Sequence, residues 1–142
     1  MARGRFPDLL IPLLILNFAL FMVVLGISGW ALDSFIDGRP TDGNSATEPL
    51  VLFSLIAGAV GVASIIIALS LVRGKSRENA TGSSTSAIIA WVLLIIAFGL
   101  ACKQIHIGNL GTTLKFLEAF VIIVMATHSL YLLVLHADEL GL

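Results

Sequence analysis

The chain has 142 residues, of which 58% are hydrophobic and 12% charged, and its formal net charge is -1. Its mean hydropathy of +1.04 is far above that of soluble domains and indicates an integral membrane protein, with the lipid bilayer as its partner. The charge gives no reason to expect nucleic-acid binding, and the single cysteine, Cys102, excludes an intrachain disulfide and a multi-cysteine metal site.

Four apolar segments follow one another along the chain, each near the roughly 20 residues that a helix needs to cross the hydrocarbon. They cover residues 9–32, 50–72, 86–107 and 114–136, and they leave an outer loop, 33–49, and an inner loop, 73–85. No room remains for a separate soluble domain. The sequence therefore predicts a single membrane domain, residues 1–142, of the all-α class: a bundle of four transmembrane helices.

The first segment is preceded by Arg3 and Arg5, which resemble the basic start of a secretory signal. Its apolar run is longer than an ordinary signal core and is interrupted by Asn17, so we expect a retained helix. Asn17 lies about two turns inside the segment, where its amide needs a hydrogen-bond partner. We expect it to join this helix to a neighbour.

The second segment carries small residues at steps of three, four, three and four, which places them on one face of a helix. They are Ser54, Ala57, Gly61, Ser64 and Ala68. Such a face lets two backbones approach closely, which is a main source of helix association in lipid. The alternative is that these are simply common membrane residues. Packing within the chain is the expected use, although the same face could serve a homo-oligomer.

The Lys and Arg residues near the segment ends predict the orientation. One side of the membrane has five of them, Arg3, Arg5, Arg73, Lys75 and Arg77, and the other side has three, Arg39, Lys103 and Lys115. We therefore expect both termini and the inner loop to be cytoplasmic. The acidic outer loop is expected to face outward.

The third and fourth segments form a hairpin around a turn at residues 108–113, with Lys103 before it and Glu118 after it at equal depth. An isolated charge at this depth is costly, so an ion pair between Lys103 and Glu118 is expected. Lys115, one turn from Glu118, is a competing partner. The pair would either lock the hairpin in register or take part in function.

A functional interpretation makes Lys103 a cationic spot for an anionic solute, which Glu118 holds or releases through a change of protonation. His106, near the surface, and His128, midway down the fourth segment, could extend a polar path inward. For His128 a structural hydrogen bond inside the bundle is the commoner role.

Other polar and aromatic residues have simpler expected roles. Trp30 and Trp91 suit the aromatic belts at the membrane surfaces, and Tyr131 and His136 look like ordinary residues of the cytoplasmic end. No phosphate loop, catalytic triad or metal-binding His pair is found, so we expect no enzyme activity, no cofactor and no metal.

Four stretches of the chain resemble the AWPM-nineteen-like family, plant plasma-membrane proteins first described as induced by abscisic acid in wheat. They are NFALFMVVLGISGWAL (17–32), GNSATEPLVLFSLIAGAVGVAS (43–64), AIIAWVLLIIAFGLACKQIHIG (87–108) and LKFLEAFVIIVMATHSLYLL (114–133). The resemblance covers roughly residues 9–135, whereas IIIALSLVRGKSREN near the inner loop departs from the family pattern. It implies four helices, a plasma-membrane location and a part in seed maturation and stress responses.

Two functions follow as expectations. The resemblance implies abscisic acid influx, since at least one family member is regarded as a carrier of this hormone. The alternative is a non-transporting structural protein that organises the membrane under dehydration or cold. Abscisic acid influx is the leading expectation, and a polar cavity reaching Lys103 would favour it. The small size of the chain, without a visible inverted repeat, supports the alternative.

Overall fold

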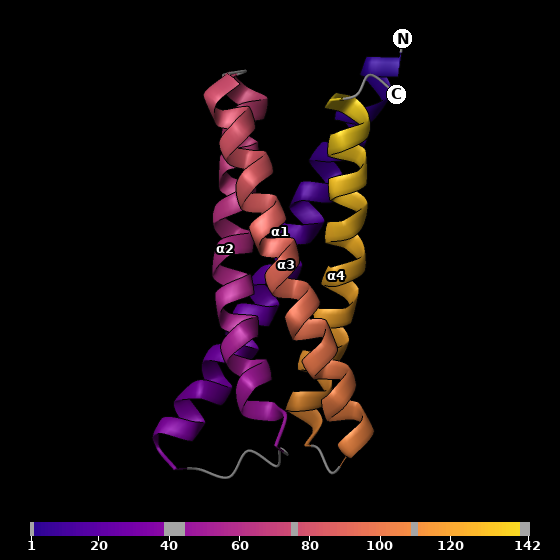
Figure 1. The fold of residues 1–142 in the computed structure, drawn as a ribbon. Coiled ribbons are helices and arrows are strands. Elements are labelled where there is room, and N and C mark those ends of the chain that lie inside the picture. The colour runs from indigo at the N-terminus through magenta and orange to yellow at the C-terminus, as the bar shows by residue number, and fades with distance from the viewer. Residues whose placement is uncertain (1, 39–44, 75–76, 109–110, 140–142) are drawn as a thin grey trace.

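The computed structural model describes residues 2–38, 45–74, 77–108 and 111–139, and its side chains over 11–38, 45–70, 84–108 and 111–136. Over these residues the regular secondary structure is all α-helix (Figure 1). The helices are α1 (Ala2–Ile36), α2 (Thr47–Gly74), α3 (Arg77–Ile107) and α4 (Thr112–Glu139). Each is longer than the apolar segment that it contains, because a helix once formed extends readily through adjoining polar residues.

Glycines with positive φ follow two of these helices. Gly38 has φ 70° and donates its N–H to the Phe35 carbonyl over 3.1 Å, beyond the end of α1. Gly108 has φ 81° and donates to the Gln104 carbonyl over 3.0 Å, beyond the end of α3. A left-handed residue after a helix is a usual stop signal, since it turns the chain away and satisfies a terminal carbonyl.

All four helices contain a span long and apolar enough to cross a membrane. These spans are Ile11–Ile36, Thr47–Ser70, Ser84–Ile107 and Thr112–His136. The prediction of a four-helix membrane bundle is therefore confirmed. Many large apolar side chains lie exposed on the outside of the bundle, such as Ile15 and Leu133, and these form the surface that contacts lipid.

The four helices form a ring in which α1 packs against α2 and α4, and α3 packs against the same two helices. Both termini lie at one end of the bundle, which we call the terminal end (Figure 1). The α1–α2 and α3–α4 connections lie at the other end, which we call the loop end. That the terminal end faces the cytoplasm stays a prediction from the distribution of Lys and Arg.

The buried face of α3 is distinguished by small and polar residues more than by hydrophobicity. On α3 the buried positions recur at steps of three and four, and they are Ala87, Ala90, Leu94, Ala97, Ala101 and Gln104. The positions between them carry exposed residues such as Ile95 and Ile105. Because lipid tails are as apolar as leucine, close packing decides which face turns inward.

The small residues that the sequence pattern placed on one face of α2 are all buried. Gly61 lies beneath the ring of Phe21 on α1, and a Cβ at position 61 would lie 2.5 Å from that ring. Gly58 is similarly placed beneath Leu25, whose Cγ would be 2.8 Å from an added Cβ. Ser54, Ala57, Ser64 and Ala68 complete this buried face. The face is thus used within the chain and is not available to a second copy.

Candidate functional site

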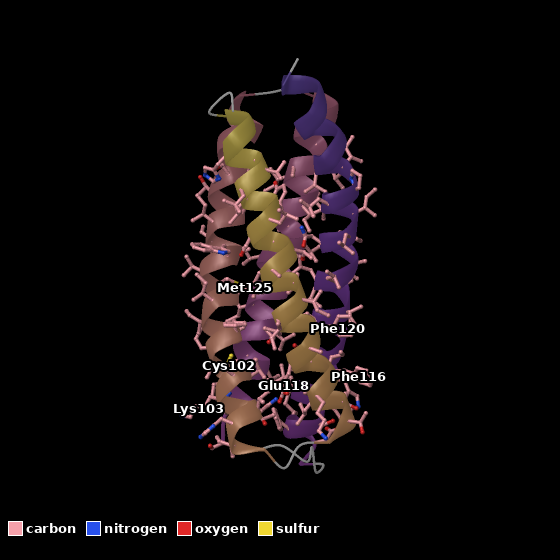
Figure 2. The ribbon with its side chains drawn as sticks, turned by 90° about the vertical axis from the view of Figure 1, so that its right-hand side faces the viewer. Cys102, Lys103, Phe116, Glu118, Phe120 and Met125 are labelled. Atoms are coloured by element: carbon pink, nitrogen blue, oxygen red, sulfur yellow. The ribbon has the colours of Figure 1, made fainter. Side chains whose placement is uncertain are left out.

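Lys103 and Glu118 lie at similar depth near the loop end but on different sides of their helices (Figure 2). Lys103 is exposed on the outside of α3, whereas Glu118 is only 6% exposed and faces the interior from α4. The expected ion pair is not formed, and no cation bonds to Glu118 from any part of the chain that the structure describes. Equal depth did not predict the contact, because two residues at one depth meet only if their side chains also point toward each other.

Gln104 occupies the position expected for Lys103. It is fully buried, and its Nε2 donates a hydrogen bond to Glu118 Oε1 over 2.6 Å. Its Oε1 accepts a hydrogen bond from Thr47 Oγ1, also over 2.6 Å. Thr47 begins α2, Gln104 lies in the last turn of α3, and Glu118 lies in the second turn of α4. This polar chain, Thr47–Gln104–Glu118, therefore links three helices at the loop end.

The polar chain lies inside the ends of the membrane spans. Glu118 is less than two turns below the start of α4, which at 1.5 Å per residue is a depth of about 9 Å. A carboxyl group at such a depth is retained only where hydrogen bonds offset its loss of water, and intramembrane ionisable groups frequently mark solute or proton pathways. This makes the polar chain the first candidate for a functional site.

A second polar contact joins α1 to α4 deeper in the bundle. Thr127 Oγ1 donates to Asn17 Oδ1 over 2.6 Å, and Asn17 Nδ2 donates to the Thr127 carbonyl over 3.4 Å. Asn17 is fully buried. It therefore has the inter-helix hydrogen bond that its place in an apolar segment requires.

His128 on α4 contacts α3 and α1 directly, and it is linked to α2 through Phe21. Its Nε2 lies 2.9 Å from the Ala87 carbonyl on α3, and because a carbonyl only accepts, Nε2 is the donor. The His128 ring meets the ring of Phe21 edge-on, at a centroid distance of 5.5 Å, and Phe21 covers Gly61 on α2. The other ring nitrogen, Nδ1, is buried and has no hydrogen-bond partner among the described residues. These contacts give His128 a clear part in packing.

The four residues expected to bind solute are therefore not brought together. Lys103 and His106 lie exposed on α3, whereas Glu118 and His128 face the interior of α4 at levels about 15 Å apart along the helix. Among the described side chains, no three His, Cys, Asp or Glu residues could together hold a metal ion.

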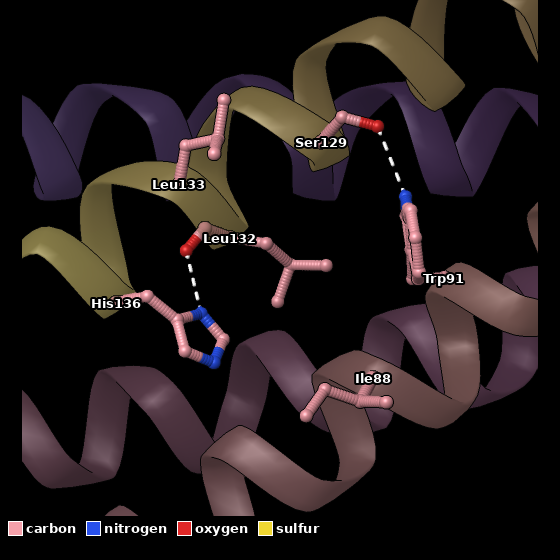
Figure 3. A pocket seen from close by; sticks show the side chains of 6 residues that line it. All are labelled: Ile88, Trp91, Ser129, Leu132, Leu133 and His136. Carbon is pink, nitrogen blue, oxygen red and sulfur yellow. Dashed lines mark hydrogen bonds between the residues drawn. The ribbon is translucent and has the colours of Figure 1, made fainter.

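A groove opens on the outside of the bundle between α3 and α4, toward the terminal end (Figure 3). Its volume is about 490 Å³, and it is lined by Ile88, Trp91, Ser129, Leu132, Leu133 and His136. Trp91 Nε1 donates to Ser129 Oγ over 3.0 Å, and Ser129 Oγ donates to the Met125 carbonyl over 2.7 Å. His136 Nδ1 lies 2.8 Å from the Leu132 carbonyl of its own helix. The groove is apolar apart from these few groups.

The sequence interpretation missed Gln104 and His136. Gln104 could have been found, because it continues the line of small residues through Ala97 and Ala101 at the next step of three and is therefore on the buried face. His136 looked ordinary because its place in the groove depends on the distance between α3 and α4. No pattern within α4 reports that distance.

Comparison with known proteins places these features in a family. The sequence model of the AWPM-19-like family matches residues 15–138. "Membrane protein PM19L" from Oryza sativa subsp. japonica is 42% identical over 130 residues, which cover 88% of this chain and 75% of the rice protein. No solved structure gives a significant match. The chain therefore belongs to the AWPM-19-like family.

Proposed function

We propose that this protein facilitates the inward passage of abscisic acid across the plasma membrane of a plant cell. The resemblance to the family implies this substrate, and the observation that carries the proposal is the buried carboxyl group of Glu118. It lies within a membrane span, with Gln104 as its hydrogen-bond partner and no cation bonded to it from the described residues. An intramembrane carboxyl group of this kind is a functional-site hypothesis by default.

The polar chain offers chemistry that suits a weak organic acid. The Gln104 amide donates to one carboxylate, that of Glu118, and can donate equally to the carboxyl group of a solute. For Gln104 to exchange partners, the solute would have to take over the hydrogen bond to Glu118, since a buried carboxyl group left without a partner is costly. Lys103 and His106, exposed on α3 near the loop end, would attract the ionised form of the acid to this mouth. His128 would meet the solute farther inward.

A second function, that of a non-transporting structural protein, is favoured by a different observation. Between the levels of Glu118 and His128 the interior of α4 is filled by Val121 and Val124, both fully buried. The Asn17–Thr127 bonds and the Phe21–His128 contact then tie the helices together below that level. A bundle closed in this way would stiffen or organise the membrane during dehydration or cold without passing a solute.

The test is the uptake of labelled abscisic acid into proteoliposomes at acidic outside pH, with the intact protein and with variants that remain folded. Saturable uptake is expected, and it should be lost in Glu118→Ala and reduced in Lys103→Ala. Glu48→Ala is the matched control for Glu118→Ala, because Glu48 is a carboxyl residue near the same end of the bundle but is exposed. No uptake above that of empty liposomes would refute transport by this chain and leave the structural function.

A further inference from the structure

We infer that the groove between α3 and α4 is a binding site for an amphipathic carboxylic acid, which enters it sideways from the bilayer. The inference rests on the proposed function in one respect: abscisic acid is the acid with which it is tested. This molecule has a methylated ring with one hydroxyl and one ketone group, and a side chain that ends in a carboxyl group. The site is distinct from the polar chain, since it lies toward the opposite end of α3 and α4.

The size and walls of the groove suit a small apolar body. Its volume of about 490 Å³ is within the range of roughly 300–1,000 Å³ typical of ligand pockets. Ile88 and Trp91 supply the α3 wall, and Leu132 and Leu133 supply the α4 wall. Leu133 is 68% exposed, so the groove is open to the surface that lipid covers. The Trp91 N–H is already bonded to Ser129, which leaves the indole to act as apolar surface.

His136 gives the groove one polar group with no assigned task. Its Nδ1 donates to the Leu132 carbonyl, since a carbonyl only accepts, and a neutral ring therefore has its lone pair on Nε2. Nε2 has no hydrogen-bond partner among the described residues and points away from that carbonyl, toward the side occupied by Ile88 (Figure 3).

The free ring nitrogen selects the chemistry of the occupant. A neutral carboxylic acid would donate its O–H to Nε2, and a carboxylate would accept a hydrogen bond from Nε2 of a protonated ring. In both arrangements one proton lies between one oxygen and Nε2, so the pair forms with either charge state of the acid. An acyl chain or a simple ester has no hydrogen to give and would leave Nε2 of a neutral ring unpaired.

A second groove on the same bundle provides an internal comparison. It lies between α1 and α4, has a volume of about 270 Å³, and is lined by Pro12, Leu13, Leu16, Leu130 and Val134. All of its lining residues are apolar, as expected for a groove that a lipid chain fills. The α3–α4 groove differs from it in having His136, and this difference favours an acid over a lipid chain as its occupant.

The experiment uses the full chain with Trp30→Phe, which leaves Trp91 as the only tryptophan, reconstituted in lipid nanodiscs. Abscisic acid should change Trp91 fluorescence saturably. His136→Phe, which keeps a ring but removes Nε2, should weaken binding about tenfold, as loss of one hydrogen bond to a charged or acidic group does. Leu130→Phe is the control and should bind like the parent, because Leu130 lies on the same helix but lines the groove between α1 and α4.

Two further measurements separate the possible outcomes. The methyl ester of abscisic acid keeps the ring hydroxyl but has no acidic O–H, so the comparison isolates the carboxyl group. The ester should bind parent and His136→Phe equally and weakly. If acid and ester bind alike, or if Trp91 does not respond, the groove is a lipid groove and the inference is overturned. Uptake by the same protein then tests the proposed function separately. Uptake without a Trp91 response would refute only binding in the groove. A Trp91 response without uptake would support binding in the groove and refute transport.

Discussion

Gln104 and Glu118 are joined by a hydrogen bond of 2.6 Å between two helices, at a level where the adjacent residue Lys103 is exposed. The bundle thus uses a neutral amide, and not a cation, to hold a buried carboxyl group. In a low-dielectric interior this choice avoids the burial of a second charge, since the desolvation of an ion pair can exceed its Coulombic gain.

Replacement of Gln104 should therefore destabilise the bundle more than replacement of Lys103. Gln104→Leu removes the donor to Glu118 and the acceptor for Thr47, and it should lower the free energy of unfolding by about 1–3 kcal/mol. Lys103→Leu should change it by less than about 0.5 kcal/mol, because the side chain is exposed. Unfolding in mixed micelles with a denaturing detergent would compare the two. Equal effects would mean that the polar chain does not stabilise the fold.

The contact between Gly61 and Phe21 predicts that a larger side chain at position 61 destabilises the bundle. Gly61→Ala places a methyl group 2.5 Å from the Phe21 ring, so the ring must move, and stability should fall by about 1–3 kcal/mol. Phe21→Leu in the same chain should recover part of this loss. Gly99→Ala is the matched control, because nothing lies within 4 Å of a Cβ at that position. The prediction fails if both alanine variants unfold alike.

The fold could be predicted from the sequence because length and apolar composition determine membrane-spanning helices almost alone. The small residues of α2 also indicated its buried face, since the spacing from Ser54 to Ala68 follows the period of a helix. The helix ends were harder to predict. Residues such as Arg77 are polar but continue α3, because hydrogen bonding within the helix extends past the apolar segment.

The candidate sites could be predicted only in part. The sequence pointed to Glu118 as a costly residue in a membrane span, but its partner depends on which face of α3 turns inward. Charge made Lys103 the obvious choice, although the small residues Ala97 and Ala101 point to Gln104. The groove beside His136 could not be predicted from the sequence, because it arises from the relative placement of two helices.

The Asn17–Thr127 pair should show coupling in a double-mutant cycle. Asn17→Leu and Thr127→Val each remove the hydrogen bond of 2.6 Å between the side chains of α1 and α4. The interaction free energy should be about 0.6–2 kcal/mol, the range measured for polar pairs between membrane helices. The same unfolding assay would provide it. Ser129→Ala with Asn17→Leu is the control cycle, since Ser129 bonds to Trp91 and Met125, and additive effects are expected there.

The orientation of the bundle can be tested with single cysteines in intact cells. After Cys102→Ser, a Ser45→Cys variant should react with a membrane-impermeant maleimide from outside, because Ser45 is exposed at the loop end. A Thr85→Cys variant, exposed toward the terminal end, should react only after the membrane is permeabilised. The physical reason is the excess of Lys and Arg near the terminal end, which resists translocation. The reverse labelling pattern would show that the loop end is cytoplasmic, and Lys103 and His106 could then not capture a solute arriving from outside.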